Sequence, residues 1–507
     1  KGERVSYDAE VVIDAAASGS AKALMEDLER LGLSQAARSG RIVSGRLPIS
    51  AIAGAADLST LQFMRPSVTR SSVGDVTTQG NEATRVSEAR TNGEVSGTGM
   101  KVGVISDSYN QKVDPGVDDA DDDIASGDLP LRSKIQILDD VPMRAPIDEG
   151  RAMMQIIRDV APNARLAFHA GLGGGRARLA EAIRDLAATG SEVIVDDLIN
   201  FTQPFFQDGV VAQTADSVAN EGIPYFSAAT NYAQQSYSSE FRGAAAGGRT
   251  FHDFDSTSSV DIYQTIQVPV GESVSFSLQW SDPYFSAGGA GADADIDVFV
   301  LNDTLGIEKT VQNPNIGGDP IEFFSFTNDG NTDTDGDGSD TRFQLAIELS
   351  DGPSPDRVKY VYFNKALSVE EYDTRSPASF GHPNAKNVAG VAAASYQDTP
   401  AFGTDPPQVQ DFSSEGGVPI YFDKDGNALS SPVVRNKPDF TAPDDADNTF
   451  FGQDTDGDGF PNFTGTSAAA PHAAAVAALM LDKNPSLTPQ EIYQKLAGSA
   501  IDMDDPA

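Results

Sequence analysis

The stretch Lys101-Val-Gly-Val-Ile-Ser106 is a short apolar run that leads directly into Asp107. An apolar run of this length is typical of a strand that is buried on both faces of a parallel sheet. Beyond it, helical and strand patterns alternate along the chain. The predicted elements are helices at 149–158, 177–189 and 210–220, and strands at 165–169, 192–195 and 223–228. This order predicts an α/β fold, a doubly wound parallel sheet with functional groups at the carboxyl ends of its strands.

Changes in composition divide the chain into five regions. Residues 1–66 predict a small α+β domain, and residues 67–97, rich in Ser, Thr, Gly, Asn and charge, predict a linker and processing region. Residues 98–244 and 371–507 carry the two parts of the α/β domain. Between them, residues 245–370 alternate apolar and polar side chains, which predicts an inserted antiparallel β-sandwich.

The composition excludes several classes of protein. The chain has 507 residues, 75 acidic against 36 basic side chains, a formal net charge of −39 and no cysteine. Without cysteine there are no thiol nucleophiles, iron–sulfur clusters or thiolate zinc sites. The negative charge would repel nucleic-acid phosphates and anionic lipids, so neither is an expected partner. No apolar window is long enough for a membrane span, and we expect any signal peptide to lie outside these residues.

The most specific motif is Gly465-Thr-Ser-Ala-Ala-Ala-Pro-His472, which opens an Ala-rich helix. A serine hydroxyl is a weak nucleophile, and it needs an adjacent base and donors for the developing oxyanion. A Gly-containing turn at the start of a helix exposes the hydroxyl of Ser467 and directs backbone N–H groups at that charge. The segment resembles the nucleophile motif of the subtilases, a family of serine peptidases.

The resemblance continues upstream in the order that subtilases show. They place an Asp at the end of the first apolar strand, which Asp107 matches, and an oxyanion Asn, which Asn231 matches. Thr230 stands where the family usually has Gly. The match spans roughly residues 98–240 and 375–500, and it implies the subtilisin-like form of the α/β fold.

The catalytic histidine of the subtilases is missing. Glu149 stands in its place, and a Glu there is the hallmark of the sedolisins, serine-carboxyl peptidases that share the subtilisin fold. Sedolisins carry a second acid four residues later, where this chain has Met153, and an oxyanion Asp where it has Asn231. The chain therefore resembles a sedolisin-like branch of the subtilases. Its four histidines lie elsewhere, at His169, His252, His382 and His472.

The resemblance implies a serine endopeptidase with a Ser467–Glu149–Asp107 triad. Glu149 accepts the proton of Ser467 as the hydroxyl attacks a peptide carbonyl, and Asp107 hydrogen-bonds Glu149 and shares a proton with it. Asn231 and the backbone N–H of Ser467 hold the oxyanion. Because two adjacent acids do not easily ionise together, we expect the pair to titrate as a unit, with an activity optimum below neutral pH. Protein or peptide substrates are the expected partners.

Asp196 and Asp197 follow the apolar residues 193–195, in the strand that lines the substrate cleft of the subtilases. Small or apolar residues are usual there. The two acids are candidates for tuning Glu149 or for binding a basic residue of the substrate. The alternative is that they begin a solvated loop.

The acidic residues are mostly aspartates, 55 Asp against 20 Glu. Short carboxylates at alternate positions of a turning loop converge on one hard cation, so Ca²⁺ is the expected cofactor. No Glu follows at the twelfth position, so these loops are not complete EF-hands, and solvated acidic turns are the alternative. The candidate ligands are Asp333, Asp335 and Asp337; Asp454, Asp456 and Asp458; and, in a looser version, Asp423, Asp425 and Asn427.

Two of the regions resemble known accessory domains. Residues 1–66 resemble a subtilase propeptide, which in that family assists folding and inhibits the enzyme, and this implies a zymogen whose own propeptide is a partner. Residues 245–370 resemble the pre-peptidase C-terminal type of β domain, through Trp280-Ser-Asp282-Pro and the acids at 293, 295 and 297. Calcium loops favour secretion or the cell surface, where that ion is abundant.

Two other functions stay open at this point. Loss of the histidine also fits a pseudopeptidase that serves as a binding or scaffolding module. A calcium-dependent surface protein would instead bind glycan or protein through residues 245–370. The joint presence of Ser467, Asn231 and Asp107 favours the peptidase, because a drifting site has no physical reason to keep its nucleophile and its oxyanion donor.

Overall fold

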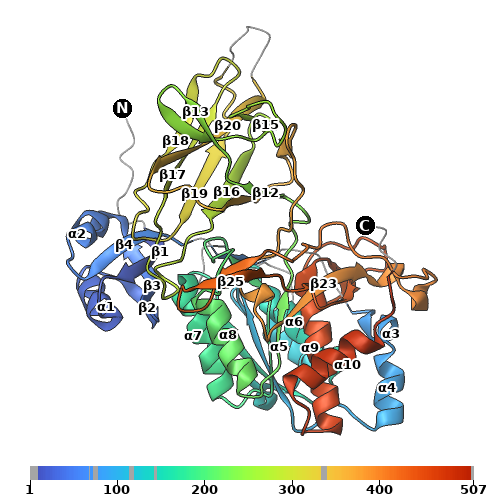
Figure 1. Cartoon of the computed structure of the whole chain (residues 1–507). Coiled ribbons are helices and arrows are strands. Elements are labelled where there is room, and N and C mark those ends of the chain that lie inside the picture. The colour runs from blue at the N-terminus through green and yellow to red at the C-terminus, as the bar shows by residue number, and fades with distance from the viewer. Residues whose placement is uncertain are drawn as a thin grey trace, which may run out of the picture.

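The computed structural model describes residues 10–67, 69–71, 78–112, 119–141, 145–332 and 340–503 of the 507-residue chain. Figure 1 shows three regions: an α/β body, an antiparallel β region above it, and a small N-terminal unit beside both. Among the helices of these residues, none is long and apolar enough to cross a membrane.

Seven parallel strands form the sheet of the α/β body. From one edge to the other they are β26 (Phe440–Asp444), β23 (Ala389–Ser395), β11 (Tyr225–Ala228), β9 (Val193–Asp196), β6 (Lys101–Ser106), β8 (Arg165–Ala170) and β7 (Ile135–Asp139). All residues of β6 and β9 are buried, as strands of a sheet covered on both faces must be. The doubly wound parallel sheet predicted from the sequence is confirmed.

The order of these strands creates a switch point between β6 and β9. From β6 the chain continues to β7 and β8 on one side, and then crosses to β9, β11, β23 and β26 on the other. The connections that leave the carboxyl ends of β6 and β9 therefore diverge; we refer to this edge of the sheet, where folds of this kind bind their ligands, as the crevice. Asp107 follows β6 and Asp197 follows β9, so both acids lie at this crevice.

Helices cover both faces of the parallel sheet (Figure 1). Along β6, Val102 and Val104 point into the core beneath α6 and α9, whereas Ile105 points into the core beneath α7 and α8. This alternation is the one that a β-strand imposes. The helices of the body are α3 (Gly80–Ala83), α4 (Val86–Gly93), α5 (Ala120–Ser126), α6 (Glu149–Val160), α7 (Gly175–Ala188), α8 (Val210–Asn220), α9 (Thr466–Lys483) and α10 (Pro489–Ser499).

Between β11 and β23 the chain forms an antiparallel β-sandwich. One sheet has the order β12-β21-β16-β19, and the other has the order β13-β14-β20-β15-β22, with β17 and β18 added beside β20. Side chains of both sheets, among them Phe276, Trp280 and Ile347, fill one apolar core, which confirms the antiparallel strands predicted here. The strands are β12 (Ser236–Glu240), β13 (Gly243–Ala246), β14 (Arg249–His252), β15 (Gln264–Gln267), β16 (Ser273–Trp280), β17 (Asp295–Leu301), β18 (Ile307–Val311), β19 (Ile321–Thr327), β20 (Arg342–Asp351), β21 (Arg357–Tyr362) and β22 (Ser368–Val369).

The N-terminal unit is a four-stranded antiparallel sheet of order β2-β3-β1-β4 with helices packed on it. The hydroxyl of Ser20 caps α1 by accepting a hydrogen bond from the N–H of Ala23 at 3.3 Å, and Leu24 and Leu28 are fully buried in the core of the unit. Its elements are β1 (Glu10–Ala17), α1 (Ala21–Arg30), β2 (Ser34–Ser39), β3 (Ile42–Pro48), α2 (Ile52–Ala56) and β4 (Leu61–Pro66).

A buried charge network joins the three regions. Arg176, at the start of α7, donates through Nε to Asp14 of the N-terminal unit at 2.9 Å and through Nη1 to Ser286 of the sandwich at 3.2 Å. Arg65 of β4 donates to Asp319 of the sandwich at 2.7 Å, and Nη2 of Arg176 lies 3.7 Å from the same carboxylate. The side chains of Asp14 and Asp319 are fully buried. Buried charges need partners, so the network fixes the N-terminal unit and the sandwich against the body.

Removal of Asp319 tests this network. We expect Asp319→Ala to lower the free energy of unfolding by about 3–5 kcal/mol, because two largely buried guanidinium groups lose their shared carboxylate. Chemical unfolding followed by the fluorescence of Trp280, the single tryptophan, measures the loss. The control is Glu26→Ala, which removes an exposed ion pair with Lys22 and should cost less than about 0.5 kcal/mol. Equal losses in the two variants would contradict the network.

Candidate active site

Asp107 is a buried acid at the end of β6. Its carboxylate accepts three hydrogen bonds, from the N–H of Glu149 at 2.8 Å, the N–H of Ile147 at 2.9 Å and the hydroxyl of Ser108 at 2.8 Å. Burial raises the pKa of Asp107, while these donors act in the opposite direction. The carboxylate therefore ties the first turn of α6 to the end of β6.

Glu149 is the first residue of α6 and is fully buried. Its backbone N–H binds Asp107, and its side chain is among the groups close enough to Asp197 to act on the pKa of that carboxyl. Asp197 also accepts a hydrogen bond from the hydroxyl of Ser106 at 3.0 Å. Burial raises the pKa of Asp197 well above its ordinary value, and the charge of Asp107 adds to the rise. Two buried carboxyl groups that face each other repel when both are ionised, so the site favours a proton on one of them.

This arrangement differs in one respect from the triad expected from the sequence. The sequence predicted that the carboxyl groups of Asp107 and Glu149 share a proton. In the structure, Asp107 instead accepts a hydrogen bond from the backbone N–H of Glu149. The acid whose carboxyl meets that of Glu149 is Asp197. Of the two roles considered for Asp197, action on Glu149 is the one that this geometry favours, since its side chain is buried rather than open to a substrate.

Asp196 points to the opposite face of β9. Its Oδ1 accepts hydrogen bonds from the hydroxyl of Ser227 at 3.1 Å and the N–H of Leu198 at 3.1 Å, and Nε2 of His382 lies 2.9 Å away. The side chain is fully buried. Asp196 is therefore directed away from Glu149 and from the crevice, which corrects its assignment as a substrate-binding candidate.

Ser467 is the second residue of α9 and follows a strained turn. Gly465 adopts a φ of 134°, which only glycine adopts readily, and its N–H donates to Asp444 at 2.7 Å. Asn231 accepts on Oδ1 from the N–H of Thr466 at 3.0 Å and from its hydroxyl at 2.9 Å. Two donors on one oxygen fix the orientation of the amide, so the NH₂ group of Asn231 is directed away from Thr466.

The helices α6 and α9 pack against each other, and both begin at the carboxyl edge of the sheet. Glu149 opens α6 beside the end of β6, and Thr466 opens α9 in contact with Asn231, which lies just beyond the end of β11. The strand between β6 and β11 is β9, which Asp197 directly follows. The fold therefore directs the starts of both helices, with Glu149 and Ser467, to the crevice that holds Asp107.

Thr230 has a φ of 78°, in the left-handed region that a β-branched residue rarely adopts. This is the position where the sequence analysis noted Thr in place of Gly. The N–H of Thr230 donates to the hydroxyl of Thr466 at 3.1 Å, and its own hydroxyl donates to Ser414 at 2.8 Å. These bonds offset a backbone strain of about 1–3 kcal/mol. They also hold the neighbouring Asn231 against the start of α9.

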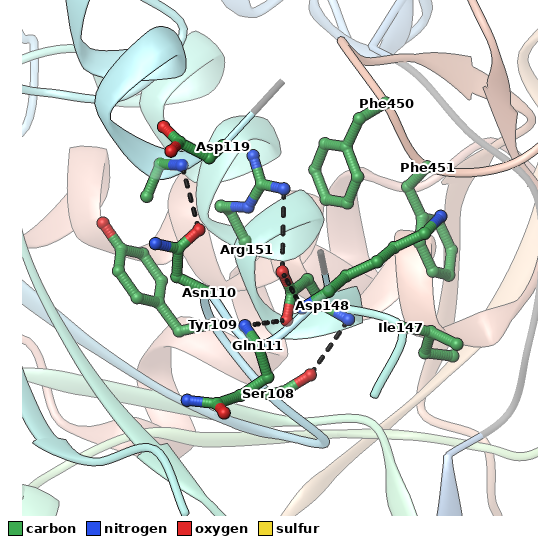
Figure 2. A network of polar contacts seen from close by, with 12 residues as sticks. Ser108, Tyr109, Asn110, Gln111, Asp119, Ile147, Asp148, Arg151, Phe450 and Phe451 are labelled. Carbon is green, nitrogen blue, oxygen red and sulfur yellow. Dashed lines mark hydrogen bonds and ion pairs between the residues drawn. The ribbon is translucent and has the colours of Figure 1, made fainter. Parts of the chain in front are cut away.

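Figure 2 shows a second network, which fixes the start of α6 through Asp148. The carboxylate of Asp148 accepts from the N–H of Gln111 at 2.8 Å and of Lys112 at 3.1 Å, and its N–H donates to the hydroxyl of Ser108 at 3.0 Å. The loop after β6 and the first turn of α6 approach so closely that a Cβ on Gly150 would lie 2.9 Å from the carbonyl oxygen of Ser108. The position of Glu149 is therefore set from both sides.

Arg151 completes this network from within α6 (Figure 2). Its side chain is fully buried, binds Asp123, lies 3.7 Å from Asp148 and stacks 3.6 Å from the centroid of the Phe450 ring. The sequence analysis did not single out Arg151 or Asp148. A signal was present, because a positive charge stands in a helix whose other residues at 152–157 are mainly apolar. Such a charge has to be paired inside the protein.

Part of the linker lies along the strand that follows the two acids. β5 (Thr69–Ser71) pairs antiparallel with β10 (Leu198–Asn200), with Ser71 opposite Leu198. Main-chain pairing of this kind is how an extended peptide binds to a strand edge. Because Leu198 directly follows Asp197, the end of β5 at Ser71 lies beside the crevice.

The loop at 454–458 gathers acids from two segments. Single carboxylate oxygens of Asp447, Asp456 and Asp458 lie within 4.8 Å of one another. Asp454 instead caps the turn, because its carboxylate accepts from the N–H of Gly457 at 2.6 Å and of Gly459 at 3.0 Å. The sequence analysis missed Asp447, which comes from β27 (Ala446–Asp447) and is brought to the loop by pairing with β28 (Asn462–Phe463).

The acidic loop at 423–427, which the structure describes in full, gives no such cluster. In the hairpin of β24 (Ile420–Phe422) and β25 (Ala428–Val433), Asp423 accepts from the N–H groups of Asp425 and Asn427, both at 2.9 Å, and Asp425 pairs with Lys424. These contacts are those of a capped turn. The loop with Asp333, Asp335 and Asp337 lies outside the described residues.

Comparisons with known proteins bear on the fold and on the segment that carries the serine motif. Residues 364–506, which include Ser467, match the model of the subtilase family. Among solved structures, the chain is similar to the CspB protease of Clostridium perfringens, with a TM-score of 0.52 and 13% identity over 84% of this chain and 92% of that chain. It is also similar to a cold-adapted subtilisin-like serine proteinase, with a TM-score of 0.31 and 11% identity over 80% of this chain and 84% of that chain. A search of curated proteins gave no match.

These comparisons bear on the resemblance that the sequence suggested. The family match confirms the subtilase resemblance for the segment that carries the serine motif. The likeness to the CspB protease, with its coverage of most of both chains, extends to the fold. The chain therefore has the subtilisin-like α/β fold, and its residues 364–506 carry the subtilase signature.

Proposed function

We propose that the protein is a serine endopeptidase of a sedolisin-like type, in which Ser467 is the nucleophile and Glu149 the general base. The observation that carries the proposal is that α6 and α9 begin at one crevice, beside Asn231 and the buried acids. A nucleophile at a helix start, a carboxyl base and an oriented amide are the parts that acyl transfer needs. Proteins or peptides are the substrates, bound in extended form along β10.

The reaction follows from these groups. Ionised Glu149 takes the proton of the Ser467 hydroxyl as its oxygen adds to the carbonyl carbon of the peptide. The amide of Asn231 and the N–H of Ser467 donate to the oxyanion, and the N-terminus of α9 favours its charge. Glu149 then passes the proton to the leaving amine as the C–N bond breaks. A water molecule, deprotonated by Glu149, hydrolyses the acyl-enzyme and restores the hydroxyl.

Labelling with a fluorophosphonate probe tests the two central roles. We expect wild-type protein to be labelled most rapidly below neutral pH, and Ser467→Ala not to be labelled. Glu149→Gln should be labelled about 10²–10⁴-fold more slowly, because the general base is lost.

The matched control for this experiment is Glu322→Gln, another buried glutamate, which lies in the sandwich and should leave the labelling rate unchanged. Labelling of Glu149→Gln at the wild-type rate would refute the role of Glu149. A folded wild-type protein, freed of its N-terminal unit, that is not labelled at any pH would favour a pseudopeptidase instead.

The N-terminal unit acts as a propeptide in this proposal. Two observations support this role. Its continuation β5 occupies β10, where a substrate would lie, and the network of Arg176, Asp14 and Asp319 holds the unit against the body. Cleavage within residues 67–97, on the carboxyl side of Ser71, converts this zymogen into the open enzyme.

Processing of the zymogen is measurable by intact mass. At acidic pH the wild-type chain should be cut within residues 67–97, whereas Ser467→Ala should stay intact. A trace of processed wild-type protein added to Ser467→Ala distinguishes cleavage by the same molecule from cleavage by another. Wild-type protein that hydrolyses peptides while its chain stays whole would contradict this role of the N-terminal unit.

Asp447, Asp456 and Asp458 fit a calcium ion, the cofactor in this proposal. Three carboxylate oxygens within 4.8 Å are the hard donors that Ca²⁺ prefers. Partial burial and the nearby charge of Asp458 raise the pKa of Asp447 to about 6, so a cation is favoured there. Bound Ca²⁺ would neutralise these acids and stiffen β27 and β28, just before the turn that carries Ser467. The loops with Asp423 and Asp333 remain further calcium candidates, and calcium dependence suits a secreted or cell-surface protein.

Removal of calcium tests this site through stability. Saturating Ca²⁺ should raise the melting temperature above that in chelator, with a gain of about 2.7 kcal/mol at a concentration 100 times the Kd. Asp458→Asn should abolish most of that gain, while Asp303→Asn, an exposed acid outside the loops, should retain it. If the melting temperature of wild-type protein is the same with calcium and with chelator, calcium binding at this site is excluded.

A further inference from the structure

We infer that Asp197 is a positioning residue of the site, a protonated acid that donates a hydrogen bond to ionised Glu149 and holds it as the base. The inference rests on the proposed function and adds a residue to it. In the subtilase pattern a small or apolar residue is usual at this position, and the second acid of the sedolisins would come from α6, where Met153 stands. Here the second acid comes from the neighbouring strand.

The register of the sheet places Asp197 in the crevice. β9 pairs with β6 in parallel, with Asp196 opposite Ile105, so Asp197 lies beside Ser106 at the ends of both strands. Val195 points into the core beneath α6 and α9. Side chains two residues apart on a strand share a face, so Asp197 also faces those helices. Asp197 and Glu149 are far apart in the sequence, but the fold therefore directs the side chain of Asp197 toward the helix that Glu149 begins.

The two carboxyl oxygens of Asp197 have different surroundings. Oδ2 accepts from the hydroxyl of Ser106 at 3.0 Å. Oδ1 is buried, and no donor among the described residues reaches it. A charged oxygen buried without a donor is costly, because it has lost its bonds to water. A proton on Oδ1 removes that cost and makes the oxygen a donor, and the side chain that Asp197 meets is that of Glu149.

The surrounding charges also favour a proton on Asp197. Burial raises the pKa of Asp197 well above its ordinary value, the charges of Asp107 and Asp196 raise it further, and the hydrogen bond from the hydroxyl of Ser106 opposes the rise. Four titratable or charged groups lie near the pair. They are Asp107 after β6; Arg151 in the first turn of α6, which binds Asp123 and Asp148; Asp196 of β9, which is paired with His382; and Tyr225 of β11, which contacts Asp196.

The consequence concerns the pH range of the enzyme. A neutral Asp197 stabilises the carboxylate form of Glu149, which is the form that accepts the proton of Ser467. When the pH rises far enough to ionise Asp197, the donor is lost and two negative charges face each other. The alkaline limb of the activity profile therefore reports the loss of the proton of Asp197, in a unit that titrates together with Glu149.

Asp197→Asn and Asp197→Ala test this inference. Asn reproduces the protonated acid, because its amide donates to Glu149 while its oxygen accepts from Ser106, but it cannot titrate. We expect Asp197→Asn to be labelled by the fluorophosphonate probe at near the wild-type rate at the wild-type optimum, with its alkaline limb moved to higher pH. Asp197→Ala should be labelled at least about 10-fold more slowly at every pH, because Glu149 loses its donor. The infrared difference spectrum of wild-type protein minus Asp197→Asn should contain the band of a protonated carboxyl.

The control is Asp159→Asn, a buried acid at the far end of α6 whose pKa burial raises to about 7. This variant changes how stability depends on pH, but it should leave the alkaline limb of labelling in place. The inference is overturned if Asp197→Asn keeps the wild-type limb or is as slow as Asp197→Ala while both variants melt like folded protein. Those outcomes leave the proposed function intact, provided that Ser467→Ala and Glu149→Gln abolish or slow labelling. If wild-type protein is never labelled, both proposals fall together.

Discussion

Burial of carboxyl groups at the switch point of the parallel sheet is the constraint on which the site depends. All strands of such a sheet end at one edge, so Asp107 after β6 and Asp197 after β9 become neighbours, and the start of α6 adds Glu149. Away from water these acids cannot all be ionised. Asp107 has three donors for its charge, whereas we propose that Asp197 and Glu149 hold a proton between them. In the proposed mechanism, Glu149 does the work that histidine does in the subtilases.

The rest of the structure holds these acids in place with buried charges that are paired. Arg151 binds Asp123 and Asp148 and keeps the start of α6 against the loop that follows β6. Arg176 joins the N-terminal unit and the sandwich to the body. Because these elements are fixed against one another, they cannot move apart to separate Asp107, Glu149 and Asp197. The three acids therefore stay close together in spite of their electrostatic repulsion. The favourable free energy of folding of the whole protein thereby offsets the free-energy cost of burying these carboxyl groups side by side.

Much of the fold and part of the site could be predicted from local patterns. The apolar run of β6, the alternation of helices and strands, and the period-two pattern around Trp280 each follow from the geometry of a single element. The motif around Ser467 and the Glu at position 149 are also local, and the proposed nucleophile and base rest on them. Asp148, Arg151 and Asp447 were missed, because each acts through a partner that sequence periodicity does not reveal.

The sequence by itself determined the elements, their order and the identity of the groups at the carboxyl ends of the strands. Only the tertiary structure decided which of those groups meet. Asp196 and Asp197 are neighbours in sequence, yet the pleat of β9 turns one toward His382 and the other toward Glu149. β27 likewise brings Asp447 close to Asp456 and Asp458, and β5 pairs with β10. Strand register and helix packing join residues that are far apart along the chain. A shift of one residue in the register of a strand would turn each of its side chains to the other face of the sheet.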